Sequence, residues 1–236
     1  MMFHSDQPTN FRLLKFCSDF MFNAKTAAVV HAYKTELESI SPIEAIKVFT
    51  WMAQSDYDIQ TISNKIDKLT SIFFNPLRSN YSQPHIDHFV NSYLHENQVL
   101  LSRMREMRPL FVKVVKSHDA SMLSGVRFSE ALQSHVNHFR FLETCIFPLF
   151  DKVLPQYGAY LRLESMFHNG FKQLLRELEY FSVNNYLDYE GFNRTVGRLY
   201  FRLTLRLYRE NFILFPLCCQ FIHNRFFDLE FANEHS

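Results

Sequence analysis

The amino-acid sequence predicts an all-α protein, organised as an antiparallel up-down four-helix bundle preceded by a small helical leader domain. Apolar residues recur at helical spacing over long stretches, and no stretch longer than a few residues alternates with a period of two, as a half-buried strand would. Only 5 of the 236 residues are glycine, which leaves little turn chemistry for an all-β fold. Four long amphipathic stretches joined by short breaks are typical of an antiparallel bundle.

The N-terminal part of the chain is expected to hold a loosely ordered arm, residues 1–22, and the helical leader domain, residues 23–80. Within the leader, Ser41-Pro-Ile-Glu44 is a helix start, because serine caps, proline is tolerated in the first turn, and glutamate three residues after serine completes a capping box. The stretch 75–84 holds two Pro, two Asn and two Ser, and it marks the end of the leader. The predicted leader helices cover 23–40, 41–54 and 58–74.

Residues 81–236 are expected to form the bundle itself. With 26 Phe in the chain, its core is expected to be aromatic. The apolar pattern is interrupted at 121–125, 155–158 and 183–191, where turn-forming residues gather. The four predicted bundle helices cover 85–117, 127–154, 158–182 and 192–227.

Charge, apolar runs and cysteine content argue against several classes of function. A formal net charge of +1 without a long basic run argues against a nucleic-acid partner, because phosphate neutralisation needs clustered Lys and Arg. The longest apolar run, Phe212–Cys219, is too short to span a bilayer, and the N-terminus shows no signal pattern, so we expect no membrane contact and a cytoplasmic location. Four cysteines without C-x-x-C spacing fit reduced thiols there. An enzyme is not favoured, because we find no Gly-rich phosphate loop, H-E-x-x-H motif or nucleophile elbow.

Two segments resemble each other when they are aligned on their Phe-Pro ends: His138-Phe-Arg-Phe-Leu-Glu-Thr-Cys-Ile-Phe-Pro148 and Arg206-Leu-Tyr-Arg-Glu-Asn-Phe-Ile-Leu-Phe-Pro216. In a bundle, a cofactor site is built from side chains that point inward from facing helices. A His and a carboxylate four residues apart share one helix face and can serve one site. Such a mixed donor set suits iron or manganese better than zinc or calcium. Each proline is expected to bend its helix, because proline lacks a backbone donor.

These segments, together with a first helix containing His88-Phe-Val-Asn-Ser-Tyr-Leu-His-Glu-Asn97, resemble the hemerythrin-like (HHE cation-binding) family. The chain is similar to bacterial and archaeal proteins of that family in which a small helical domain of unknown function precedes the bundle. The resemblance spans roughly residues 25–225. It implies a non-haem iron site, mononuclear or di-iron, and a sensing or regulatory role towards oxygen, nitric oxide or iron.

The resemblance also implies where metal ligands would stand on the two Phe-Pro helices. In the family, such a helix has a His ten residues before the proline and a Glu four residues after that His. The first segment keeps His138 but has Leu142 in place of the Glu, with Glu143 one residue further on. The second keeps Glu210 but has Arg206 in place of the His, and Arg206 can pair with Glu210 one helical turn away.

The other two bundle helices match the family pattern in part. On the first, the expected His position holds Asn91, with His88 and His95 one turn away on either side. On the third, His168 matches a family His, and Lys172 stands four residues later. The candidate metal ligands are therefore His138, His168, His88, Glu210, His95 and Glu143.

The sequence leaves three states of this site open: a complete di-iron centre, a reduced site with one metal and three or four ligands, or no native metal. Each candidate ligand also has an interpretation without chemistry. His88 and His95 would lie on the surface, His138 and His168 would be core residues, and the glutamates would be ordinary charges on a helix face. An aromatic-lined cavity for an apolar ligand or a porphyrin is a further interpretation. The favoured function is a sensing or regulatory module. The alternative is a metal-free protein-interaction module whose leader helices bind a protein partner or form a homodimer.

Overall fold

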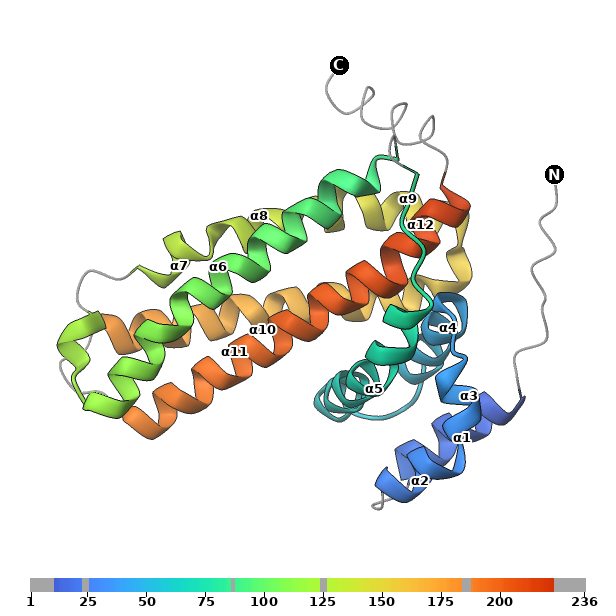
Figure 1. Cartoon of the computed structure of the whole chain (residues 1–236), viewed down its shortest axis with the longest axis horizontal. Helices are drawn as coiled ribbons and strands as arrows, with labels where there is room; N and C mark the ends of the chain where they lie inside the picture. Colours follow the sequence, from blue (N-terminus) through green and yellow to red (C-terminus); the bar gives the residue numbers. More distant parts are fainter. Residues whose placement is uncertain (1–10, 23–25, 86–87, 124–126, 184–187, 223–236) are drawn as a thin grey trace.

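The structure, a computed structural model, describes residues 11–22, 26–85, 88–123, 127–183 and 188–222. Every regular element within these ranges is helical, which confirms the predicted all-α class (Figure 1). Residues 1–10 of the expected arm and residues 223–227 of the last expected helix lie outside the described ranges. In the described part of the chain, no helix combines the length and the apolar character needed to cross a lipid bilayer.

The N-terminal segment differs from the predicted arm, because residues from Phe11 onward form a packed helix. Phe16 and Phe20 lie one helical turn apart on this helix, and both are fully buried. Burial of each phenylalanine stabilises the folded segment by about 2–3 kcal/mol. A loosely ordered arm would leave both side chains in water and lose this stabilisation. The helices of this part are α1 (Phe11–Phe22), α2 (Thr26–Ala32), α3 (Lys34–Glu38), α4 (Pro42–Ala53) and α5 (Ile59–Ser79).

Helix α4 begins where the capping motif predicts. The backbone N–H of Glu44 donates to Ser41 Oγ at 3.3 Å, and the backbone N–H of Ser41 donates to Glu44 Oε2 at 2.9 Å, which completes the capping box. Helix α5, in contrast, continues through Pro76 and ends at Ser79, inside the stretch expected to be a boundary. It persists because Leu77 lies beyond the proline and is buried in the core.

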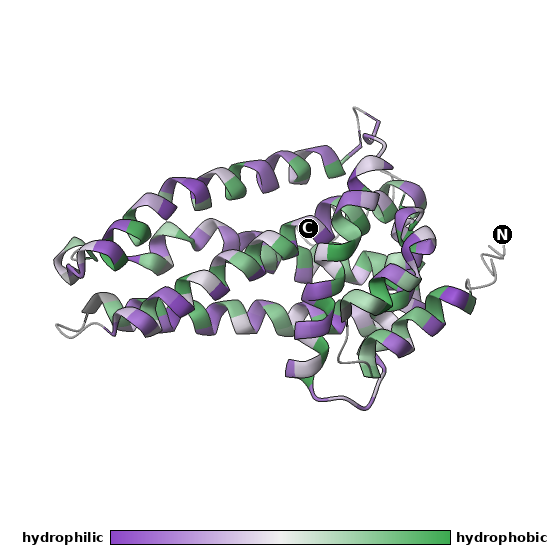
Figure 2. Cartoon of the chain, turned by 60° about the horizontal axis from the view of Figure 1, so that its bottom comes forward, coloured by the Kyte–Doolittle hydropathy of each residue, from purple (hydrophilic) through white to green (hydrophobic). Residues whose placement is uncertain are grey.

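The remaining helices are long and lie lengthwise beside one another (Figure 1). Helix α11 contacts both α6 and α10, and α10 also contacts α8. Hydrophobic and hydrophilic residues alternate along them, as amphipathic helices require (Figure 2). The breaks at η1 and η3 fall where the sequence predicts them, whereas the break at Leu132 between α7 and α8 was not predicted. The elements are α6 (Val90–Ser117), η1 (Ala120–Leu123), α7 (Phe128–Ala131), α8 (Gln133–Phe141), η2 (Leu142–Ile146), α9 (Phe147–Val153), η3 (Pro155–Tyr157), α10 (Gly158–Val183), α11 (Tyr189–Arg209), η4 (Glu210–Leu214) and α12 (Phe215–Phe221).

The two Phe-Pro segments share an unusual backbone. The elements η2 and η4 are π-helical turns of five residues, and each ends two residues before its proline, Pro148 or Pro216. Proline offers no N–H to the preceding turn, and a wider turn is one way for a helix to accommodate that missing donor. The resemblance between the segments therefore extends from their residues to their backbone conformation.

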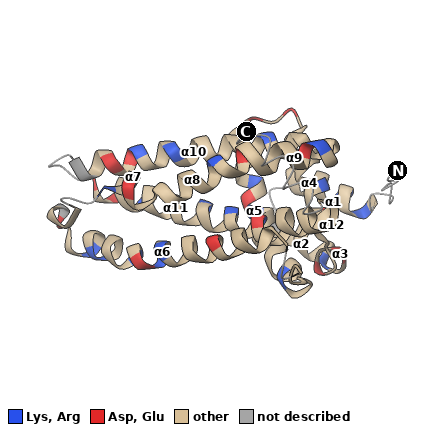
Figure 3. Ribbon diagram, turned by 90° about the horizontal axis from the view of Figure 1, so that it is seen from above, with Lys and Arg blue, Asp and Glu red and all other residues tan. Residues whose placement is uncertain are grey.

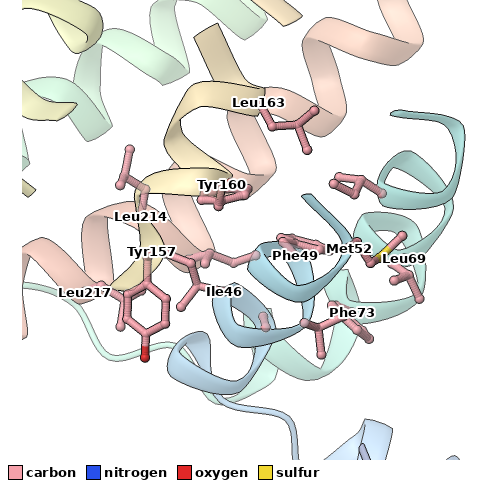
Figure 4. Packing of buried hydrophobic residues seen from close by; sticks show 14 of the residues in the cluster. Ile46, Phe49, Met52, Leu69, Phe73, Tyr157, Tyr160, Leu163, Leu214 and Leu217 are labelled. Carbon is pink, nitrogen blue, oxygen red and sulfur yellow. The ribbon is translucent and has the colours of Figure 1, made fainter. Parts of the chain in front are cut away.

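The hydrophobic core has two parts. The larger cluster joins the N-terminal helices to one end of the long helices: Phe49 of α4 lies between Phe73 of α5 and Tyr160 of α10, with ring centroids 5.8 and 5.7 Å apart (Figure 4). The second cluster fills the other end around Phe111 and Phe192. Helices α4 and α5 pack directly on the long helices, while α1 packs on α4 and α3 on α5.

Candidate functional site

A layer of buried polar side chains crosses the long helices between the two hydrophobic clusters. On α8 and η2, for example, Phe139 belongs to the second cluster and Leu142 to the larger one, and His138 lies beside that division. We call this set the polar layer. It consists of Asn97 of α6, His135 and His138 of α8, Glu164 and His168 of α10, Arg206 and Arg209 of α11, and Glu210 of η4.

His138 stands at the centre of the polar layer, between two carboxylates. Its Nδ1 lies 3.0 Å from Glu96 Oε2 and its Nε2 lies 2.8 Å from Glu210 Oε2, so both ring nitrogens can donate. Burial opposes the charged ring, yet the attraction of Glu210 and then Glu96 outweighs burial and raises the pKa of His138 to about 9. At neutral pH, His138 is therefore an imidazolium with a proton on each nitrogen.

Glu210 is held by two cations and an amide. Its Oε1 accepts from Arg206 Nε at 2.7 Å, and its Oε2 accepts from both His138 and Asn97 Nδ2, the latter at 3.0 Å. Burial disfavours its charge, but His138 and Arg206 outweigh burial and lower the pKa of Glu210 to about 2. The predicted pairing of Arg206 with Glu210 across one helical turn is confirmed.

The chain of charges continues from Arg206 towards the N-terminal helices. Arg206 donates to Glu164 Oε2 at 2.7 Å, and Arg209 Nε donates to Glu164 Oε1 at 2.6 Å. Arg209 also reaches Asp67 Oδ1 on α5 at 3.3 Å and Thr70 Oγ1 at 3.4 Å. Acids and cations thus alternate from Glu96 on α6 to Asp67 on α5, so the polar layer ties the long helices to the N-terminal ones.

His168 of the polar layer pairs with Glu143 of η2, which lies at the edge of the layer. His168 Nδ1 is hydrogen-bonded to Glu143 Oε1, while its buried Nε2 has no partner among the described residues. The imidazole stacks on Phe139 at a centroid distance of 4.4 Å, and the Arg206 guanidinium lies 4.9 Å from the centroid of the same phenyl ring. Burial, and then the charge of Arg206, lower the pKa of His168 far below its usual value, so this ring is neutral.

The two remaining candidate ligands, His88 just before α6 and His95 on α6, are placed elsewhere. His88 Nε2 lies 3.2 Å from the carbonyl oxygen of Ile222, at the end of α12, and His95 is exposed beside a surface hollow. The side chains that α6 turns towards His138 and Glu210 are instead Glu96 and Asn97. The helix is therefore rotated relative to the orientation that the ligand assignment required.

Several residues of the polar layer carried no assignment in the sequence analysis. The sequence did contain a signal for Asn97. It lies seven residues after Val90 and three before Leu100, so it shares a helix face with these two apolar residues, and all three are buried. His135 was missed because it precedes His138 by three residues and no carboxylate stands four residues from it. It is buried, neither ring nitrogen has a partner in the described part of the chain, and burial lowers its pKa to about 4, so it is neutral.

The donor chemistry around Glu210 does not suit a metal ion. A doubly protonated imidazole has no lone pair for a metal, and Glu210 already faces two cations. Among the described residues, no three His, Cys, Asp or Glu side chains come together in a geometry that could hold a metal ion.

No protein-family model, curated protein or solved structure matches the chain.

Proposed function

We propose that this chain is a hemerythrin-like four-helix bundle, with a helical leader domain at residues 23–80, in which side-chain cations take the place of the metal. It would act as a metal-free protein-interaction module. The paired π turns before Pro148 and Pro216 support the common origin of the two ligand-bearing helices. His138 and Glu210 are the family ligand types that remain in the two segments, and their side chains lie 2.8 Å apart in the core. Two residues that once bound the same metal centre are expected to lie close together in this way.

The observation that carries this proposal is the position of Glu210 between the His138 imidazolium and the Arg206 guanidinium. Two unit charges 4 Å apart interact by about 4 kcal/mol at an effective dielectric constant of about 20, and a divalent ion doubles this figure. A metal beside Glu210 would therefore be repelled by two cations that already neutralise the carboxylate.

The test is the metal content of the full chain after purification without chelator and after anaerobic reconstitution with iron, manganese or zinc. We expect none of these at stoichiometric level. The double variant Arg206→His with Leu142→Glu, which restores the family ligand types in both segments, is expected to gain metal, whereas Arg198→His at an exposed position of α11 is not. One or two bound metals per wild-type chain would overturn the proposal.

A second candidate is a reduced metal site with a sensing or regulatory role towards oxygen, nitric oxide or iron. It is favoured by one observation: the His138 ring lies within hydrogen-bonding distance of two carboxylates, Glu96 at 3.0 Å and Glu210 at 2.8 Å. Because His138 must first lose a proton, metal uptake under this candidate would increase as the pH rises towards 9. The four cysteines are free thiols, which fits a cytoplasmic location for either candidate.

A further inference from the structure

A groove with a volume of about 620 Å³ runs along the outer side of α6 and α11, away from the polar layer. Along α11 it extends from Asn193 to Tyr208, about 22 Å at 1.5 Å per residue. The Tyr200 hydroxyl donates to the backbone carbonyl of Met104 on α6 and so joins the two helices beneath it. A groove of this length matches about four turns of a helix.

The groove exposes apolar side chains on both of its walls. Phe201 of α11 is 52% exposed and Val112 of α6 is 42% exposed, and both line it. Single exposed hydrophobic residues are normal on a protein surface, but apolar residues that gather on opposite walls of one groove are typical of a contact site. The apolar lining therefore favours an occupant with an apolar face.

Gly197 lies in the middle of α11 and also lines the groove. A Cβ atom at this position would meet nothing within 4 Å, so the packing of the chain itself does not require glycine there. Glycine inside a helix costs about 0.5–1 kcal/mol relative to alanine. Close approach of a second backbone from outside the chain would account for a residue that the fold itself does not need.

The charge of the groove is positive. Arg105 and Arg108 line it, neither makes an ion pair with any described residue, and no acidic side chain is among the described residues of its lining. Figure 3 shows basic residues on both α6 and α11, with acidic residues among them on α6. A second copy of the chain would bring the same two guanidinium groups against these, so charge disfavours self-association here and favours an acidic occupant.

We propose that this groove binds an acidic amphipathic helix of a partner protein. The apolar face of that helix packs over Gly197 and against Phe201 and Val112, and its carboxylates pair with Arg105 and Arg108, as in helix-in-groove recognition. The inference rests on the proposed role as an interaction module but not on the metal content of the polar layer. Binding of the helix and absence of metal can therefore succeed or fail independently.

The test uses the full chain and two fluorescein-labelled peptides of 18 residues, followed by fluorescence anisotropy. Both peptides carry leucine at helical spacing; one has glutamate and the other lysine at the remaining positions. We expect the glutamate peptide to bind at least about tenfold more tightly than the lysine peptide, and the double substitution Arg105→Glu with Arg108→Glu to weaken it by about tenfold. Arg176→Glu, at an exposed position of α10 outside the groove, should leave the affinity unchanged.

A second variant keeps the test independent of folding. Gly197→Leu adds a good helix former where a side chain has room, so circular dichroism should stay unchanged while peptide binding is lost. Equal affinities for the two peptides, or binding that survives Gly197→Leu, would overturn the proposal. It would also be overturned if sedimentation showed a dimer that Gly197→Leu dissociates. Tighter binding by a synthetic peptide of residues 223–236 would assign the groove to the C-terminal segment of the chain and equally contradict the proposal.

Discussion

Replacing Arg206 by methionine tests how much the polar layer contributes to stability. Methionine keeps much of the length of the side chain and removes its charge. In the wild type, the Arg206 guanidinium bonds Glu210 at 2.7 Å and Glu164 at 2.7 Å, and the side chain is nearly fully buried. The substitution leaves both carboxylates in the core with one cation fewer to compensate them.

The expected loss follows from the partners that remain. Removing one member of a buried ion pair destabilises a protein by about 3–5 kcal/mol. Glu210 keeps His138 and Asn97, and Glu164 keeps Arg209, so we expect a loss of about 3 kcal/mol, at the lower end of that range. Since domains are stable by about 5–15 kcal/mol, this is a large fraction of the total.

The assay is urea-induced unfolding at pH 7, followed by circular dichroism. Arg198→Met, at an exposed position of the same helix, is the matched control and should change the free energy of unfolding by less than about 0.5 kcal/mol. Adding Glu210→Gln to Arg206→Met should recover part of the loss, because it removes one of the two carboxylates that Arg206 had compensated. A loss below about 1 kcal/mol for Arg206→Met would refute the reasoning that the polar layer is a cooperative network of buried charges.

Three further predictions concern pH, a glycine and a helix cap. The pKa of His138 is raised from 6.5 to about 9, so its contribution to stability is fully present below pH 6.5 and is lost as the pH rises through 9. In urea unfolding, the free energy of unfolding should fall by about 3 kcal/mol over this pH interval, and His138→Gln should abolish the fall. Gly197→Ala should stabilise the protein by about 0.5–1 kcal/mol in the same assay, because its Cβ has room. A destabilised Gly197→Ala would contradict this account of α11. Ser41→Ala should cost about 0.5–2 kcal/mol by removing the capping box of α4, and an unchanged thermal midpoint would show that the cap is dispensable.

Local signals in the sequence predicted most helix boundaries. The start of α4 follows from Ser41 and Glu44, and the break between α9 and α10 coincides with Pro155 and Gly158. Several boundaries were missed, among them the division between α2 and α3, the start of α1 and the end of α5. Helix α1 was expected to be loose although Phe16 and Phe20 are one turn apart, and α5 continues past Pro76 because burial of Leu77 outweighs the lost backbone bond.

The candidate site was predictable only where its residues belong to one helix. The pairing of Arg206 with Glu210 depends on their spacing of four residues and was found from the sequence. The partners from other helices, such as Glu96, Glu164 and Asp67, depend on the rotation and axial offset of each helix, which local spacing does not encode. The rotation of α6 is the clearest case, since it brings Asn97 inward and leaves His95 exposed.

The protonation state of the His138 ring tests most directly whether side-chain cations replace a metal at this site. We would record the ¹⁵N chemical shifts of the imidazole at pH 7 in the full chain, assign them with His138→Gln, and repeat the measurement with excess zinc. Both ring nitrogens should carry a proton, and zinc should leave their shifts unchanged. A neutral ring, or a nitrogen that loses its proton when zinc is added, would contradict the account.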